Sequence, residues 1–513
     1  MNALDSIIAA VSPGWAMRRE RARVQANYYR RAYENAYPTR LRKRATDQGS
    51  GNSASMMAIG PLRDYARQLE RNHDISRGIL GILVRNIVGP NGIGVEPQPK
   101  DMNGEVHDEL AEQLDNLFDD WCERPEVTGE QDFAGAQQLL CRSWVRDGEA
   151  LYQHVMGYLA TLRHGGAVPY SIEMIEADLL PLTLTDISAG IYQGVERNAW
   201  GRATGYHLYK THPHDPATFG FPDVKRVAAA NIGHIKAVDR IGQVRGVSMF
   251  ASVLGRLDDV KDYEESERIA AKIAASLAAV IKKGSPDMFD PASLTNPDGS
   301  RKSLREMRFE PGMVLDNLLP GEDVQMLDAK RPNINAAAWR KGQLQAVASG
   351  VDVSHSASSK DYDGSYSALR QELVDQYSAY AALSAAFVNM CVRPIYTQFV
   401  AASQMAGLIK LPKSVDPNTI TDALYIAPRI PWIDPQREAA ANEIMEDRAW
   451  TSAPDIIRSR GGNPREVAKA QAHWIRLKAR LGIPDVVTGK QLPQQVVPPA
   501  ADDVATPAQQ ENA

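Results

Sequence analysis

The chain has 513 residues, of which 43% are hydrophobic, so it can bury a sizeable core in roughly two to four domains or in one elongated subunit. Its 58 basic and 63 acidic residues give a formal net charge of −5, which excludes a protein that coats nucleic acid through a uniformly basic surface. Three widely separated cysteines, Cys122, Cys141 and Cys391, fit a reducing compartment, exclude a cysteine-rich zinc site and are expected to be buried as small apolar residues. No apolar run reaches the length of a membrane span, and the N-terminus lacks the charge order of a signal peptide.

The N-terminal segment Met17–Arg44 is basic, with ten Arg and Lys residues against two Glu residues and with tyrosines interleaved. Such a segment is able to grip phosphates and stack on bases, or else it is an amphipathic surface helix whose tyrosines face inward. The second interpretation is the more common one for a run of charges. The candidate basic residues of this arm are Arg18, Arg19, Arg21, Arg23, Arg30 and Arg31.

Helical periodicity then dominates the chain up to a clear change at Asp147 and Gly148. A loop is expected over Asp47–Ser55, followed by a helix with Pro61 at its first position. Further helices are predicted from Ile75 to the turn-rich Gly89–Gly94, over Val106–Trp121 and over Phe133–Arg146.

Alternating and turn-rich sequence follows as far as Lys236, which predicts strands. The first strand is expected from Leu151. Val195–Arg197 and Tyr206–Tyr209 flank a turn and are predicted to form a hairpin.

The stretch Gly246–Gly284 is predicted to be one unbroken helix, because no proline interrupts it and an apolar stripe runs along it at helical spacing. Ser248 is the expected N-cap, and Gly284 is the expected C-terminal glycine in the left-handed conformation. At about 1.5 Å per residue the helix would be roughly 50 Å long, which is more than a compact domain of ordinary size requires.

The C-terminal part is again mainly helical. Two short strands are expected around the turn Pro320–Glu322. The predicted helices are Asn335–Gly350, Tyr366 to about Met405, one that begins at Pro435 after the cap Asp434, and one capped by Asn463. The last thirty or so residues are rich in Pro, Ala and Gln and are expected to be disordered.

No established catalytic motif is present. The best candidate for a metal site is the trio His207, His212 and His214, although an exposed hairpin tip explains these residues better. A weaker candidate is the acidic cluster of Asp119, Asp120 and Glu123 at a helix end. Another is the set Ser354, His355 and Asp361 in a polar loop, which has the residue types of a hydrolytic triad.

Several segments, taken in order, resemble the lambda-type portal proteins of tailed bacteriophages. They are NHDISRGILGILVRNIVGPNGIGVEPQ, DFAGAQQLLCRSWVRDGEAL, IEADLL, GVERNAWGRATGYHLY, NIGHI with RIGQVRGVSMFASVLGRLDDVKDYEESE, LLPGEDV, GSYSALRQELVD and WIDP. Each is weak alone, but their order and spacing are specific, and the resemblance spans Arg71 to Pro464.

The resemblance implies a mixed α+β, mainly helical portal fold with wing, stem, clip and crown, assembled as a ring of usually about twelve subunits. Such a ring forms the channel at one capsid vertex through which double-stranded DNA is packaged and ejected. The implied partners are the terminase large subunit, the major capsid protein, the scaffold and the head-completion or adaptor proteins. The implied location is the virion, with assembly in the host cytoplasm, and no membrane, cofactor or enzymatic activity is expected. The alternatives are a metal-dependent hydrolase built on the three histidines, or another virion ring such as a connector or tail hub.

The same resemblance implies a division of the chain. The expected parts are a basic arm (1–60), the first part of the wing (61–179), a β-rich clip (180–245), the stem helix (246–284), the second part of the wing (285–322), channel loop and tunnel helix (323–350), wing helices (351–433), crown (434–482) and a disordered tail (483–513). A first stem helix before the clip is not identifiable.

Charged residues in the stem and channel parts are the candidate functional residues. The candidate DNA-channel residues are Lys330, Arg331, Arg340 and Lys341, which are equally well explained as solvated charges or intersubunit ion pairs. The candidate stem residues, expected either to pair between subunits or to form an acidic wall, are Asp258, Asp259, Asp262, Glu265, Arg268 and Lys272.

Overall fold

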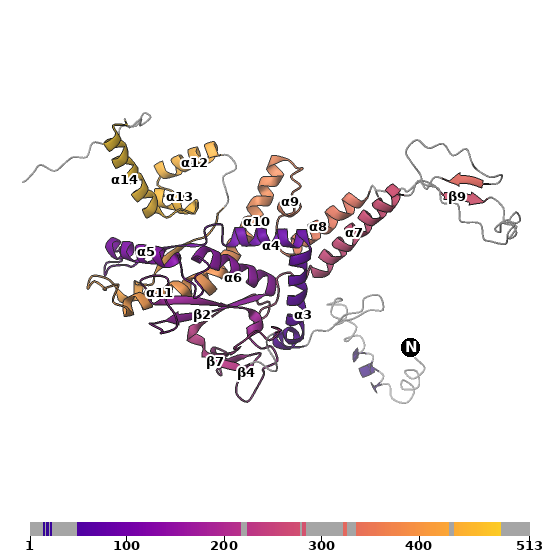
Figure 1. Ribbon diagram of the computed structural model, residues 1–513, viewed down its shortest axis with the longest axis horizontal. Helices are drawn as coiled ribbons and strands as arrows, with labels where there is room; N and C mark the ends of the chain where they lie inside the picture. Colours follow the sequence, from indigo (N-terminus) through magenta and orange to yellow (C-terminus); the bar gives the residue numbers. More distant parts are fainter. Residues whose placement is uncertain are drawn as a thin grey trace, which may run out of the picture.

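The computed structural model describes residues 14–15, 17–19, 21–22, 49–216, 223–276, 280–283, 322–325, 335–429 and 435–483. Helices pack over a small antiparallel sheet to form the body of the molecule (Figure 1). A pair of helices, α7 and α8, projects from this body, and three C-terminal helices lie at another side of it (Figure 1). The described part is therefore mixed α and β and mainly helical, as expected from the sequence.

Four helices build one layer of the body. Three of them match the predictions closely, namely α4 (Asp74–Ile87), α5 (Asp108–Cys122) and α6 (Phe133–Asp147). Their starts are fixed by side-chain caps: the carboxylate of Asp132, for example, accepts a hydrogen bond from the backbone N–H of Gly135 at 2.7 Å. Gly148 ends α6 in the left-handed conformation, and a Cβ atom there would lie 2.2 Å from the backbone of Val247.

The first of these helices starts earlier than predicted. α3 covers Gly51–Asn72, and Ser50 caps it by accepting a hydrogen bond from the N–H of Ser53. The predicted loop therefore overlaps a helix, and Pro61 lies inside α3 instead of opening it. Burial of Ile59, on the turn before the proline, shows why tertiary packing outweighs the local loop signal.

The central sheet has the strand order β3-β2-β8, with β2 (Glu149–Met156) antiparallel to both β3 (Tyr170–Ile175) and β8 (Ile232–Lys236). Its middle strand begins directly after α6, so the predicted change from helix to strand at Asp147–Gly148 is confirmed. Trp121 of α5 stacks on Tyr170 of β3 with ring centroids 5.3 Å apart, and it donates a hydrogen bond to the Tyr170 carbonyl.

A second antiparallel sheet has the order β4-β5-β6-β7. The predicted hairpin is confirmed, because β5 (Val195–Arg197) pairs with β6 (Ala203–Tyr209). The outer strands are β4 (Ile191–Tyr192) and β7 (Val224–Ala228), and short 3-10 turns occur at Ala177–Leu179, Ala229–Asn231 and Pro417–Thr419. A separate two-stranded ladder joins β1 (Gly94–Pro97) to β11 (Ala423–Ile426) far along the chain.

The predicted single helix over Gly246–Gly284 is wrong at both ends. The helix α7 covers Leu254–Ser276, and residues 280–283 form strand β9 (Val280–Lys283), paired with β10 (Glu322–Gln325). The start fails because residues 246–253 are folded against the body: a Cβ on Gly246 would lie 2.0 Å from the Gly148 carbonyl oxygen. Ser248 accordingly caps Phe250 in a turn instead of starting the helix. The predicted C-cap Gly284 lies outside the described residues.

A long helical path follows α8 (Ala336–Gly350) and the short α9 (His355–Ser359). It consists of α10 (Tyr366–Phe387), a π-helical turn (Val388–Val392) and α11 (Arg393–Met405), so the predicted helix from Tyr366 to Met405 is confirmed as one path with a wide turn inside it. Pro394 has no N–H to bond the carbonyl four residues earlier, that of Met390. The Tyr152 hydroxyl donates to this carbonyl at 2.9 Å.

The C-terminal helices are α12 (Pro435–Asp447), α13 (Ala453–Ser459) and α14 (Pro464–Leu481). Asn463 caps α14 as predicted, by accepting a hydrogen bond from the N–H of Arg465. Asp434 and the tail from residue 484 onward are not among the described residues.

Cys141 and Cys391 are buried as predicted, and burial raises the pKa of both thiols. Cys122 is only partly buried. Within the described ranges, no helix is long and apolar enough to span a bilayer.

Candidate functional site

Helices α7 and α8 pack on each other as they leave the body (Figure 1). At the base, Leu254, Leu257 and Val260 of α7 are buried in the same apolar core as Leu344 and Val347 of α8. Further out, the rings of Tyr263 and Trp339 lie 4.2 Å apart between their centroids. The pair is therefore held by side chains over much of its length.

Two predicted channel residues of α8 form ion pairs within the chain, and one of these pairs joins α8 to α7. Arg340 of α8 donates to the Glu264 carboxylate of α7, and Lys341 lies 3.0 Å from the Asp361 carboxylate. Both cations thus have partners within their own chain, although both remain about half exposed. Lys330 and Arg331 lie in a part of the chain that the structure does not describe.

The predicted stem residues divide into two groups. Asp258 accepts a hydrogen bond from Tyr65 of α3, and burial together with the Asp258 carboxylate raises the pKa of that tyrosine to about 12. The others are exposed along α7, namely Asp259, Asp262, Glu265, Arg268 and Lys272. One residue of the six therefore belongs to the anchoring of the helix, and five remain at its surface.

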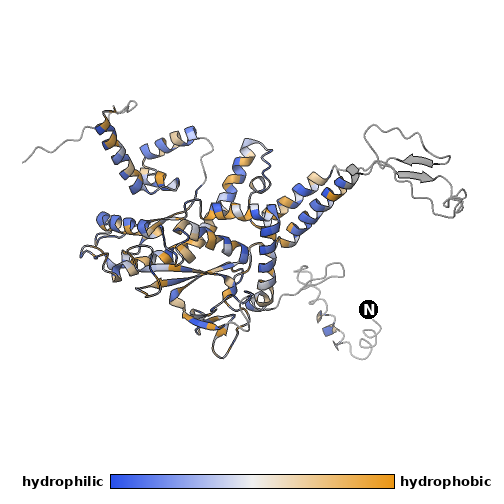
Figure 2. Cartoon of the chain, in the orientation of Figure 1, coloured by the Kyte–Doolittle hydropathy of each residue, from blue (hydrophilic) through white to orange (hydrophobic). Residues whose placement is uncertain are grey.

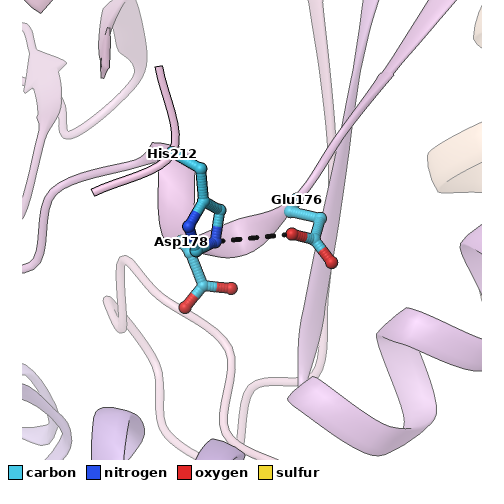
Figure 3. Close-up of side chains that lie close together, drawn as sticks. All are labelled: Glu176, Asp178 and His212. Carbon is cyan, nitrogen blue, oxygen red and sulfur yellow. Dashed lines mark ion pairs between the residues drawn. The ribbon is translucent and has the colours of Figure 1, made fainter. Parts of the chain in front are cut away.

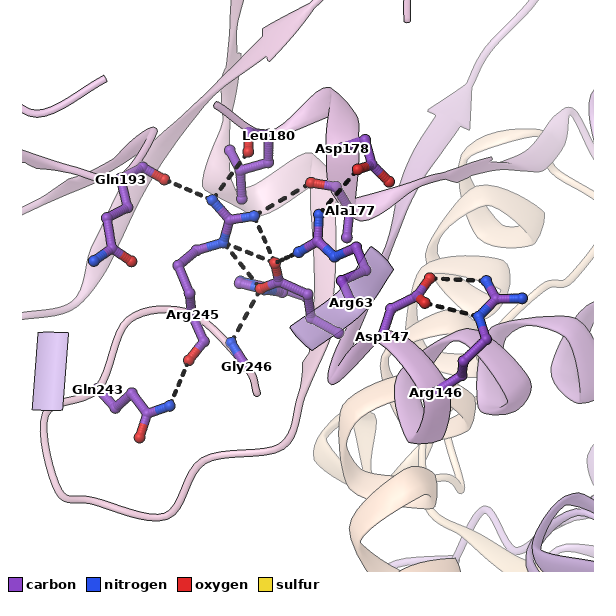
Figure 4. Close-up of polar contacts among 12 residues, drawn as sticks. Arg63, Arg146, Asp147, Ala177, Asp178, Leu180, Gln193, Gln243, Arg245 and Gly246 are labelled. Carbon is purple, nitrogen blue, oxygen red and sulfur yellow. Dashed lines mark hydrogen bonds and ion pairs between the residues drawn. The ribbon is translucent and has the colours of Figure 1, made fainter. Parts of the chain in front are cut away.

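The root of α7 is fixed by a buried ionic network that sequence reasoning did not find. The Arg245 guanidinium donates to the Glu149 carboxylate, and neither side chain is exposed. Arg245 also donates to the carbonyl oxygens of Ala177, Leu180 and Gln193 (Figure 4). Arg63 of α3 donates to the same carboxylate at 2.8 Å. The sequence signal was a Glu directly before the apolar residues Ala150 and Leu151 at the start of the strand.

Charge balance explains why this carboxylate stays ionised. Burial alone would raise the pKa of Glu149, but Arg245 and His234 outweigh that effect and hold it well below the ordinary value. The network continues through Asp178 and Asp147, which accept hydrogen bonds from Arg67 of α3. It thus joins α3, both sheets and the segment leading into α7.

The three histidines are not brought together. His207 on β6 lies 3.7 Å from the Glu196 carboxylate, whereas the His212 and His214 rings are 5.9 Å apart between centroids. In the part of the chain that the structure describes, the one group with metal-ligand spacing is Glu176, Asp178 and His212 (Figure 3).

Two arginines already bind the Asp178 carboxylate of this group. Asp178 already accepts hydrogen bonds from Arg63 and Arg67, and this charge lowers its ability to hold a cation. The predicted ligand set of the hydrolase alternative is therefore wrong, and the set that replaces it is largely neutralised.

The other two candidate sets have local structural roles. The Ser354 hydroxyl caps α9 by accepting from the N–H of Ala357, and Asp361 pairs with Lys341, so these residues do not form a triad with His355. Asp119 and Glu123 line a cavity of about 420 Å³ next to α14, whereas Asp120 does not. Neither belongs to a metal-ligand group among the residues described.

The family model for "Phage portal protein, lambda family" matches residues 37–383, well over half of the chain. The chain belongs to the lambda family of phage portal proteins. The resemblance identified from the sequence is thereby confirmed. Portal proteins are structural components of the virion.

One portal relative is the "Probable portal protein" of Halomonas phage phiHAP-1, which is 25% identical over 468 residues, or 89% of this chain and 88% of the relative. Among solved structures, the neck of a native gene transfer agent particle computed with C12 symmetry has a TM-score of 0.40 and 13% identity, and it covers 77% of this chain and 93% of its own. A chain from the virion of a native gene transfer agent particle has a TM-score of 0.40 and 11% identity, with 84% and 98% covered.

The basic arm of this portal protein is described only in fragments. Arg18, Arg19 and Arg21 are exposed in short helical pieces. Arg23, Arg30 and Arg31 fall outside the residues that the structure describes.

Proposed function

We propose that copies of this chain, about twelve, assemble as a ring at one capsid vertex, and that double-stranded DNA passes through its central channel during packaging and ejection. The observation that carries the proposal is the helix pair α7–α8. The pair is packed into the core at its base and projects from the body, and the chain belongs to the portal protein family.

The charges of the pair fit a channel that DNA slides through. Each phosphate neutralised by Lys or Arg adds a salt-dependent grip, so a conduit for a polyanion must present few free cations. α7 carries six acidic and four basic residues, with Asp259, Asp262 and Glu265 exposed beside the exposed Arg268 and Lys272, and Arg340 is paired with Glu264. An acidic or internally neutralised wall of this kind repels or ignores DNA instead of binding it. The same exposed acids also suit ion pairs between neighbouring subunits, and the test below distinguishes the two roles.

The path of the chain supports a stem made of both helices. The chain leaves the body along α7 and returns along α8, with β9 and β10 paired between them. We propose that α7 and α8 together are the stem, so that α8, which the resemblance assigned to the tunnel, is a stem helix.

The ring also serves as a platform for the terminase large subunit, the scaffold, the major capsid protein and the head-completion or adaptor proteins. Residues 180–245 remain our candidate for the clip that meets these partners. The segment between α7 and α8 is the competing candidate, because strands β4–β7 pack against the body through the Arg245 network. Crosslinking of purified rings to the terminase from each segment in turn distinguishes them.

Electron microscopy of the purified full-length protein tests the ring directly. Rings with an axial channel support the proposal, and a monomer at every concentration contradicts it. A ring located elsewhere in the particle than the packaging vertex would identify a connector or tail hub instead.

The channel role of the predicted cations is tested with the pair Arg340→Ala and Lys341→Ala. We expect rings to form normally while DNA packaging or retention changes, because removing these cations leaves Glu264 and Asp361 unpaired and makes the wall more acidic. A matched control is Arg163→Ala, which removes an exposed arginine in the loop between β2 and β3, outside the candidate clip. Packaging equal to wild type in the double variant would remove these residues from the channel.

To test the acids, Asp262→Asn with Glu265→Gln should raise the salt dependence of DNA retention if they face DNA, and weaken ring assembly if they pair between subunits.

A further inference from the structure

The three C-terminal helices expose large apolar side chains. No residue of α12, α13 or α14 is buried, and the exposed side chains include Trp474 at 53%, Leu481 at 61% and Ile444 at 52%. Apolar bands alternate with hydrophilic ones along these helices (Figure 2). A cluster of this kind, bordered by charge, marks an interaction surface.

Helix α14 carries a seam suited to another helix. Val467, Ala470, Trp474, Leu477 and Leu481 follow the alternating three-and-four spacing of helices that pack side by side. The first half of α14 is tied to the body through ion pairs of Arg465 with Asp108 at 3.0 Å and of Lys469 with Glu112 at 2.8 Å. Every residue from Ala470 to Arg476 is exposed, so the outer half of the seam is uncovered within one chain.

The charges of α12 and of the outer half of α14 are opposite. α12 has four acidic residues and one arginine, a net charge of −3. From Gln471 to Leu481, α14 has three basic residues, Arg476, Lys478 and Arg480, and no acidic residue, a net charge of +3. Ile444 on α12 and Trp474 on α14 offer apolar area to accompany the charges.

We infer that α12 of one copy of this chain packs on the outer half of α14 of the next copy. The contact joins two different surfaces, so each copy offers one to each neighbour, and such a head-to-tail contact closes into a ring when the rotation permits. Opposite charge fixes the pairing, and the exposed apolar side chains become covered. The inference rests on the proposed ring and adds the surfaces that join its subunits at the C-terminal helices.

Crosslinking of the double variant Ile444→Cys with Trp474→Cys tests the contact. Full-length protein is treated with a short bis-maleimide and run on a denaturing gel, beside wild type to account for the native cysteines. We expect a ladder of multimers, because the two new thiols face each other across copies. The control pairs Trp474→Cys with Trp200→Cys, which lies 94% exposed in the β5–β6 turn, and should give no ladder.

The outcomes separate this inference from the proposed function. A fast-migrating product confined to the monomer means that α12 and α14 pair within one chain and overturns the inference. Rings in the microscope without a ladder also overturn it, while the proposed function stands. Absence of rings from the wild-type protein contradicts the proposed function and the inference with it.

A charge exchange provides the second test. Arg476→Glu with Arg480→Glu should reduce the crosslinked ladder about tenfold at low salt, because like charges then meet across the contact. Adding Glu438→Arg and Glu446→Arg to the same chain should restore the ladder. Equal ladders in all three proteins would overturn the pairing of these two helices.

Discussion

Arg245 and Glu149 form an ion pair in which neither side chain is exposed to solvent, at the point where the chain turns into α7. Replacing Arg245 with Met should lower the free energy of unfolding by about 3 kcal/mol, because it leaves a buried carboxylate with only part of its compensation from Arg63. Urea denaturation followed by circular dichroism measures the change. Arg226→Met, which breaks the exposed pair with Glu196, is the control and should leave the midpoint unchanged. Equal midpoints for both variants would mean that the buried pair does not anchor the fold.

Acid should destabilise the protein through His154. Burial lowers the pKa of this histidine from 6.5 to about 4, so below pH 6.5 the unfolded chain takes up a proton that the folded chain refuses. Stability should therefore fall between pH 6.5 and 4 and level off below, with a contribution of about 3 kcal/mol. Thermal melts across this range should show a smaller pH dependence for His154→Gln, which keeps an acceptor for the Tyr170 hydroxyl. His214→Gln, at an exposed position, should melt with the wild-type pH dependence.

Tyr152 should be needed for its hydroxyl as well as for its ring. Its hydroxyl donates to the Met390 carbonyl, which Pro394 has no N–H to bond. Tyr152→Phe should cost about 1–3 kcal/mol, because the hydrogen bonds of the hydroxyl to the Met390 and Cys391 carbonyls are then lost. Tyr158→Phe, on an exposed tyrosine, serves as the control in the same denaturation experiment. A loss no larger than that of the control would show that water replaces the hydroxyl.

The two faces of α7 should respond differently to truncation. Leu257→Ala should destabilise the chain by about 2–5 kcal/mol, because its side chain is completely buried at the root of the helix pair. Ile269→Ala, on a half-exposed residue of the same helix, should leave the unfolding midpoint of the single chain nearly unchanged. If subunits pack along α7, the second variant should instead shift the ring equilibrium in sedimentation velocity. Identical effects of both variants on the midpoint would contradict this division.

The sequence predicted those elements whose signals are local. α6 begins at the cap Asp132 and ends at Gly148, and the β5–β6 hairpin surrounds a turn, so both follow from neighbouring residues alone. The order of family motifs was equally readable, because it requires no knowledge of contacts.

Contacts between distant residues explain what the sequence missed. The residue types of 246–253 are compatible with a helix, but the backbone of Gly246 packs directly against the Gly148 carbonyl, almost a hundred residues earlier in the chain. Arg245 and Glu149 are likewise 96 residues apart, and nothing in either neighbourhood indicates the other. The end of α7 was missed because Val280 and Ile281 are β-branched residues that pair with β10, a strand whose position the periodicity does not reveal.

The pairing of Lys283 with Glu322 has a consequence for how this gene can change. The chain leaves the β9–β10 ladder after Lys283 and re-enters it at Glu322, so the stretch between these residues is attached at two adjacent points. Doubling the length of such an insert costs only about 0.6 kcal/mol of closure entropy. Changes in the length or sequence of this stretch are therefore expected to leave the buried charges at the start of α7 unaltered.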